Sequence, residues 1–142
     1  MANATMRKFG FPETVVREFG HWVVLLRPAQ VTLGSLVLAA KSEATALADL
    51  PAEAFAELAA VVPAIETALR HFVDYERINY LMLMMVDPNV HFHVIPRYSK
   101  ARDWEEIAFP DEGWPGPPQL KLAVALDANR MKSLIEQLKE HF

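Results

Sequence analysis

The sequence contains no cysteine, which excludes disulfides, thiolate catalysis and cysteine-based zinc sites. Lysine and arginine form no runs, and the formal net charge is −4, so we expect no surface for a nucleic acid polymer. No stretch approaches the roughly 18 consecutive apolar residues of a membrane span, so we expect no membrane partner. Residues 1–12 lack the apolar segment of a signal peptide, and we expect a cytoplasmic location.

The composition is nevertheless that of a protein with a substantial core. Hydrophobic residues make up 52% of the 142 residues, which is the size of one ordinary domain. Internal repeats and low-complexity tracts are absent, and the proline-rich stretch at 113–118 has too little chain after it for a second domain. We therefore expect residues 1–142 to form a single domain.

Apolar runs predict the strands of a sheet, at residues 14–19, 21–27, 35–40, 78–86 and 89–97. The second and third runs are close enough in sequence to pair as antiparallel neighbours. The run at 78–86 is apolar almost throughout, which is typical of a strand covered on both faces. Only Asp87 and Pro88 separate it from the last run, which predicts a hairpin in the middle of the sheet.

Between these strands, apolar residues at spacings of three and four predict a long amphipathic helix of about 20 residues, from Phe55 to Phe72. Pro51 suits its first turn, and Pro63 predicts a kink or a break. A final helix is predicted after Asp127, a good N-cap. The order of elements predicts an α+β fold, an antiparallel sheet with the long helix packed on one face and a C-terminal helix.

The most informative stretch is Asn-Val-His-Phe-His-Val-Ile-Pro-Arg at 89–97. On a strand, Asn89, His91 and His93 project from one face, and the apolar residues between them point into the core. An imidazole can act as a nucleophile, an acid, a base or a metal ligand. Two imidazoles on one face favour a catalytic or ligand-binding pair over chance exposure.

Other residues bear on the same site. Arg27 and Arg97 stand at strand ends, where each could bind a phosphate or remain a solvated cation. A metal site is an alternative use of the two histidines, but zinc usually takes three or four ligands. His21 or His71 could complete such a set, although no spacing requires it, and we expect no metal and no cofactor.

The run at 90–97 resembles the signature of the histidine triad (HIT) family, His-x-His-x-His-x-x with hydrophobic residues at x. The order of elements over residues 15–100 is also similar to the family's, and the extension at 99–142 is not covered. The resemblance implies a HIT-like fold and, as is usual in the family, a homodimer. Its members are nucleotide hydrolases and transferases that cleave a phosphorus–nitrogen or phosphoric anhydride bond beside a nucleoside monophosphate.

Carried over residue by residue, the resemblance implies that His91 attacks the α-phosphorus and forms a nucleotidyl-histidine, which water later hydrolyses. A backbone carbonyl would hold the proton on its other nitrogen. His93 would contact phosphate oxygens, and we expect Asn89, Arg27 and Arg97 to bind the substrate. That substrate would be a small nucleotide conjugate, either a phosphoramidate or a dinucleoside polyphosphate.

The chain departs from the family pattern at several positions. Asn89 stands where the first histidine of the triad is expected, and Ser35 replaces another common histidine. The phosphate-binding loop before the motif is reduced to Asp87-Pro88, and Arg27 stands where relatives carry a ribose-binding acid or amide. A non-catalytic nucleotide-binding module is therefore the alternative function, followed by a histidine-based metal-binding protein.

Overall fold

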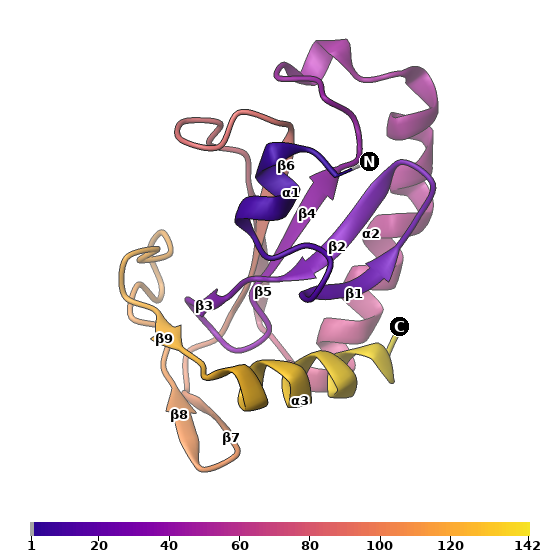
Figure 1. Cartoon of the computed structure of the whole chain (residues 1–142). Helices are drawn as coiled ribbons and strands as arrows, with labels where there is room; N and C mark the ends of the chain where they lie inside the picture. The colour runs from indigo at the N-terminus through magenta and orange to yellow at the C-terminus, as the bar shows by residue number, and fades with distance from the viewer. Residues whose placement is uncertain (1) are drawn as a thin grey trace.

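The computed structural model describes residues 2–142, and its centre is a five-stranded antiparallel sheet in the order β1-β2-β4-β6-β5 (Figure 1). This arrangement confirms the predicted α+β class and the pairing of the second and third runs. The strands are β1 (Val15–Glu18), β2 (Trp22–Leu26), β4 (Leu36–Ala40), β5 (Arg77–Leu81) and β6 (His91–Arg97). β6, which carries the two histidines, lies between β4 and β5.

The helix α2 (Ala52–Val73) covers one face of the sheet, as the apolar stripe predicts. Its residues Val61, Ile65 and Leu69 are fully buried and pack with the strand residues facing them. The predicted break at Pro63 does not occur, because the helix continues through this residue. Pro63 lies on the exposed side, where water can satisfy the carbonyl that loses its helical hydrogen bond.

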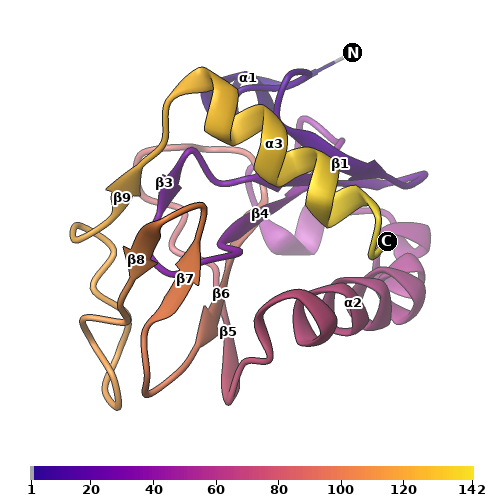
Figure 2. The same cartoon turned by 90° about the horizontal axis from the view of Figure 1, so that it is seen from below.

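The opposite face of the sheet is covered by a short helix, α1 (Ala4–Lys8), which the sequence analysis did not predict. Figure 2 shows α1 and α2 on opposite sides of the sheet. Met6 of α1 packs with a second apolar cluster that includes Val23, Leu25 and Val37. Asn3 caps the helix by accepting from the amide of Met6 (2.9 Å) and donates to the carbonyl of Ala40 (2.9 Å). α1 is therefore fastened to the sheet by polar and apolar contacts.

The apolar run at 78–86 is shorter as a strand than predicted. β5 ends at Leu81 and pairs with β6 alone, so the hairpin is confirmed, but β5 lies at the edge of the sheet. The remainder belongs to a loop over residues 82–90, in which Met85 is 85% and Val86 is 82% exposed. An apolar run alone cannot distinguish a buried strand from an exposed apolar loop.

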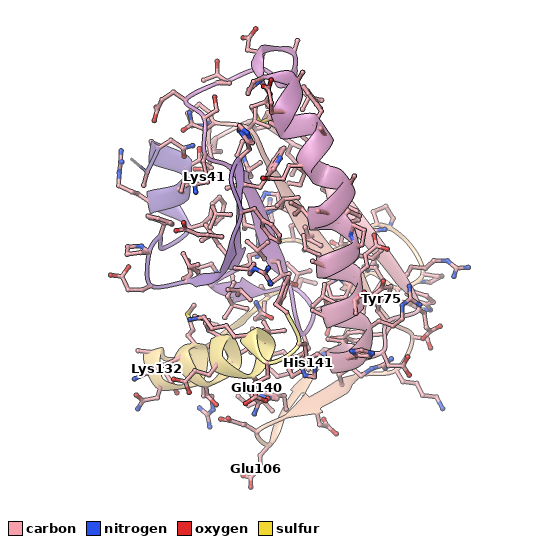
Figure 3. All side chains as sticks on the ribbon, turned by 90° about the vertical axis from the view of Figure 1, so that its right-hand side faces the viewer. Lys41, Tyr75, Glu106, Lys132, Glu140 and His141 are labelled. Carbon is pink, nitrogen blue, oxygen red and sulfur yellow. The ribbon has the colours of Figure 1, made fainter. Side chains whose placement is uncertain are left out.

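The C-terminal extension packs back onto this core. The extension contains one two-stranded hairpin, one short strand that pairs with residues 29–30, and one helix. The helix, α3 (Ala128–Lys139), begins after Asp127, which caps it by accepting from the amide of Arg130 (2.8 Å), as predicted. α3 contacts β1, and His141 just beyond it lies beside the end of α2 (Figure 3). The remaining elements are β3 (Ala29–Gln30), η1 (Leu47–Asp49), β7 (Arg102–Trp104), β8 (Ile107–Phe109) and β9 (Val124–Ala125). No helix within residues 2–142 is both long and apolar enough to cross a membrane.

The turn before β4 depends on Gly34. Its φ of +89° lies in the left-handed region, and an added Cβ would come 3.0 Å from Val73 and 3.1 Å from Leu69 of α2. We expect Gly34→Ala to lower the free energy of unfolding by about 1–3 kcal/mol, measured by urea denaturation. Gly20→Ala is the control, because its φ is not positive and its Cβ meets only the flexible Glu57 carboxylate. Equal losses in the two variants would contradict this explanation.

Candidate functional site

The two histidines of β6 lie together, as strand alternation predicts. Their ring centroids are 5.2 Å apart with the ring planes nearly perpendicular, and both side chains are buried. Phe92 and Val94, which alternate with the histidines, pack on the core cluster under α2, and Val94 is fully buried. β6 therefore divides its side chains between the core on one face and the imidazole pair on the other.

The main chain determines which ring nitrogen of His91 carries a proton in the neutral form. Its Nδ1 lies 2.8 Å from the carbonyl oxygen of Asn89. A carbonyl oxygen can only accept, so Nδ1 carries the proton of the hydrogen bond. In the neutral ring, Nε2 is therefore left with a free electron pair, which is the form that a nucleophilic imidazole requires.

His93 is held in the opposite tautomer by Arg27. The Nε of Arg27 donates to Nδ1 of His93 over 3.4 Å, and an arginine N–H can only donate. Burial of the ring, followed by the positive charge of Arg27 and the neighbouring His91, lowers the pKa of His93 to about 4. His93 is therefore neutral at neutral pH, with an N–H donor at Nε2.

The histidines form one wall of a cavity of about 360 Å³, which is within the size range of small-molecule sites. Its polar wall also includes Arg27, Lys8 and Asp87. Lys8 and Asp87 form an ion pair of 3.3 Å, so Arg27 is the only lining cation in the described chain without a carboxylate partner. The apolar wall consists of Phe9, Leu120 and the loop residues 83–86.

Phe9 is a site residue that sequence reasoning missed, as are Lys8 and Leu120. It follows α1 directly, and its ring centroid lies 5.7 Å from those of both His91 and His93. A helix of five residues is too short to show a hydrophobic period, so the sequence carries no pattern that would place Phe9 over a strand some eighty residues away. Phe9 closes one side of the imidazole pair from water.

Asn89 lies next to the histidines but its amide is directed to other partners. Its Oδ1 accepts from the amide nitrogen and from the hydroxyl of Thr5, both at 3.2 Å, and its Nδ2 donates to the carbonyl of Glu43 at 3.0 Å. β6 begins only at His91, so strand alternation does not extend to this residue. Asn89 is not among the residues that line the cavity.

Arg97 is not brought to the histidines. It is 4% exposed at the other end of β6, where its Nε and Nη2 donate to the Asp111 carboxylate at 2.7 and 3.0 Å. Its Nη1 donates to Asn79 at 2.8 Å. The guanidinium therefore fastens the C-terminal extension to the sheet, and it lines a separate cavity of about 490 Å³.

Ser35 and His71, which the sequence analysis considered for the site, have other surroundings in the structure. Ser35 is fully buried, and its hydroxyl donates to the carbonyl of Thr32 at 2.7 Å inside the turn before β4. Within residues 2–142, no three side chains of the kinds that ligate metals are grouped closely enough to hold an ion. His71 lies instead beside His141, with ring centroids 6.2 Å apart.

No protein-family model and no curated protein sequence matches the chain, but solved structures of histidine triad proteins do. One from Sinorhizobium meliloti has a TM-score of 0.77 at 17% identity, over 100% of this chain and 96% of that one. Another, from Bradyrhizobium japonicum, has a TM-score of 0.74 at 18% identity, over 99% and 96%. A hypothetical histidine triad nucleotide-binding protein from Sulfolobus tokodaii has a TM-score of 0.66 at 20% identity, over 90% and 82%. At these identities the likeness establishes a HIT-like fold.

The lowered pKa of His93 makes stability depend on pH. A histidine in the unfolded chain takes up a proton near pH 6.5, whereas native His93 does so only near pH 4. Between these values the unfolded state binds more protons, so the free energy of unfolding falls as the pH falls. The full shift corresponds to about 3 kcal/mol, and solvent screening in the open cavity reduces the expected contribution to about 2 kcal/mol, measured by urea denaturation at several pH values.

The matched variant for this measurement is His93→Asn, which removes the titrating group and should flatten the dependence between pH 6.5 and 4 relative to the native chain. His21→Asn, which makes the same replacement at a half-buried position outside the cavity, is the control. Equal slopes for the native chain and His93→Asn would show that His93 is not held neutral.

Proposed function

We propose that the protein is a nucleotide hydrolase or transferase of the histidine triad type. It would cleave a bond at the α-phosphate of a nucleoside monophosphate derivative. The observation that carries the proposal is the 2.8 Å hydrogen bond between His91 Nδ1 and the Asn89 carbonyl, which leaves Nε2 free on the wall of a cavity. The HIT-like fold supports the same function.

The chemistry runs in two displacements. Nε2 of His91 attacks the phosphorus and forms a nitrogen–phosphorus bond, while the bond to the leaving group breaks and the leaving group takes its electron pair. In hydrolysis, water then attacks the phosphorus, the electron pair returns to Nε2 and the proton of the water passes to solvent. In transfer, another nucleophile replaces water. The neutral His93 donates from Nε2 to a phosphate oxygen, and Arg27 supplies positive charge.

A non-catalytic nucleotide-binding module is the second candidate, and a specific observation favours it. The position of the first triad histidine is held by Asn89, whose amide contacts Thr5 and Glu43 and cannot titrate. The loop at 82–88 carries no hydroxyl or amide side chain that could donate a hydrogen bond to a leaving group.

The homodimer and the cytoplasmic location stay predictions.

Replacement of His91 tests the proposal directly. We expect the native chain to release adenosine monophosphate from an adenosine phosphoramidate, and His91→Ala to lower this rate by about a thousandfold or more because the covalent step is lost. His21→Ala, outside the cavity, is the control. Quenching with an alkaline denaturant, in which the nitrogen–phosphorus bond survives, should trap a nucleotide on the peptide that contains His91.

The enzyme proposal would be contradicted if the native chain released no nucleoside monophosphate from any of several phosphoramidates and dinucleoside polyphosphates. Calorimetric binding of a nucleoside monophosphate to such an inactive but folded protein would support the binding module. If calorimetry of this inactive protein shows no heat with any nucleoside monophosphate, both the enzyme proposal and the binding-module proposal are contradicted.

The charge of the cavity predicts which of the two substrate classes, phosphoramidates or dinucleoside polyphosphates, has the higher kcat/KM. Arg27 is the one cation lining the cavity that no described carboxylate pairs with, which matches the single ionised phosphate of a phosphoramidate better than a polyphosphate chain. We expect kcat/KM for an adenosine phosphoramidate to exceed that for a dinucleoside tetraphosphate by about tenfold or more.

Asp87→Asn is the matched variant for this ranking. It removes the partner of Lys8 and adds an unpaired cation to the cavity wall. Because the ion pair is partly exposed, the preference should narrow only about two- to threefold, and more at low salt than at high salt. Faster turnover of the polyphosphate by the native chain would contradict the charge argument.

A further inference from the structure

The helix α1 and Phe9, the residue that follows it, contact the candidate site at three points. Thr5 hydrogen bonds to Asn89, Phe9 packs beside both imidazoles, and Lys8 pairs with Asp87. Figure 1 shows α1 lying over the sheet close to the start of β6. The N-terminal segment is therefore part of the surroundings of the histidines.

The contact between Thr5 and Asn89 is reciprocal. The amide nitrogen and the hydroxyl of Thr5 both reach Oδ1 of Asn89 at 3.2 Å, and the amide nitrogen of Asn89 donates to the Thr5 hydroxyl at 3.0 Å. Both residues are almost fully buried. Hydrogen bonds removed from water hold their geometry more strictly than exposed ones, and each loses more when one partner is deleted.

Asn89 is also held on its other side. Its Nδ2 donates to the carbonyl of Glu43 at 3.0 Å, and the next residue, Val90, donates its amide to the carbonyl of Ala44 at 3.1 Å. The peptide between Asn89 and Val90 is thus fixed between α1 and the segment that follows β4. The carbonyl oxygen of this peptide is the group that accepts from His91 Nδ1 at 2.8 Å.

We propose that Thr5 and Asn89 are positioning residues for His91: the Thr5–Asn89 contact fixes the Asn89 carbonyl, and this carbonyl keeps the imidazole proton on Nδ1 and the free electron pair on Nε2. The role of Asn89 is then to orient the nucleophile from its main chain, not to bind substrate from its side chain. This inference rests on the proposed function for its effect on turnover, but the tautomer of His91 is measurable without any substrate.

An asparagine meets the requirements of this position. Its side chain accepts the two donors of Thr5 in buried hydrogen bonds and donates to the Glu43 carbonyl in a partly buried one. Aspartate would accept from Thr5 but would leave the Glu43 carbonyl without its donor and bury a charge. Leucine would leave the partners on both sides unsatisfied.

Thr5→Val is the variant that tests the positioning role, because it replaces the hydroxyl with a methyl group and leaves Asn89 and His91 unchanged. Thr5→Ala is a second variant, which removes the hydroxyl without adding a methyl group to the buried contact. Thr5→Ser keeps the hydroxyl and should restore the native behaviour. Thr32→Val is the matched control, since Thr32 is also buried and its hydroxyl donates to the Pro96 carbonyl near the other end of β6.

Two readouts separate positioning from a general loss of stability. ¹⁵N NMR of the imidazoles should show a single neutral tautomer of His91, protonated at Nδ1, in the native chain, Thr5→Ser and Thr32→Val, and a mixture of tautomers in Thr5→Val and Thr5→Ala. With an adenosine phosphoramidate, kcat should fall about tenfold in these last two variants while KM changes less than about twofold.

An unchanged His91 tautomer in folded Thr5→Val and Thr5→Ala would overturn the inference, as would a kcat equal to that of Thr32→Val. These results would leave the proposed function intact. If the native chain turns over no substrate, the proposed function fails, and the ¹⁵N spectra alone decide whether Thr5 and Asn89 position His91.

Discussion

The hydrogen bond from His91 to the Asn89 carbonyl is the contact on which the candidate site depends. At 2.8 Å it assigns the proton to Nδ1 and directs the free electron pair of the neutral ring to Nε2. His93 is in the reverse state, because Arg27 donates to its Nδ1. The pair therefore combines one acceptor and one donor, both at Nε2. Two chemically identical side chains acquire different roles because one is paired with a carbonyl and the other with a guanidinium.

This division of roles requires that β6 be covered on both faces by different elements. α2 packs on the face where Val90 and Val94 are buried, so the strand is anchored without using the histidines. On the other face, α1 excludes water with Phe9 but leaves a cavity toward Arg27 and the loop at 82–88. Burial there lowers the pKa of His93 and keeps it neutral. The fold thus supplies both the rigidity and the low polarity that the site needs.

Much of the fold could be predicted because its signals are local and repeated. The stripe of α2, the cap at Asp127 and the alternation around His91 each follow from residues close in sequence. The short helix α1 carries no such period, and its place is set by contacts with residues such as Asn89, 84 positions beyond Thr5. The sequence predicts strand for the apolar loop after β5 because hydrophobicity alone does not report burial.

The two arginines show why the site could be predicted only in part. Both stand near strand ends, and in the sequence each is an equal candidate for binding a phosphate. The difference lies in distant partners: Arg97 is buried against Asp111, and a buried guanidinium without that carboxylate would be strongly destabilising. Arg27 is half-buried and has no carboxylate partner among the ion pairs of the described chain, so its charge remains available to a phosphate in the cavity. Availability of charge is a property of the folded surroundings, which is why spacing in the sequence could not separate the two.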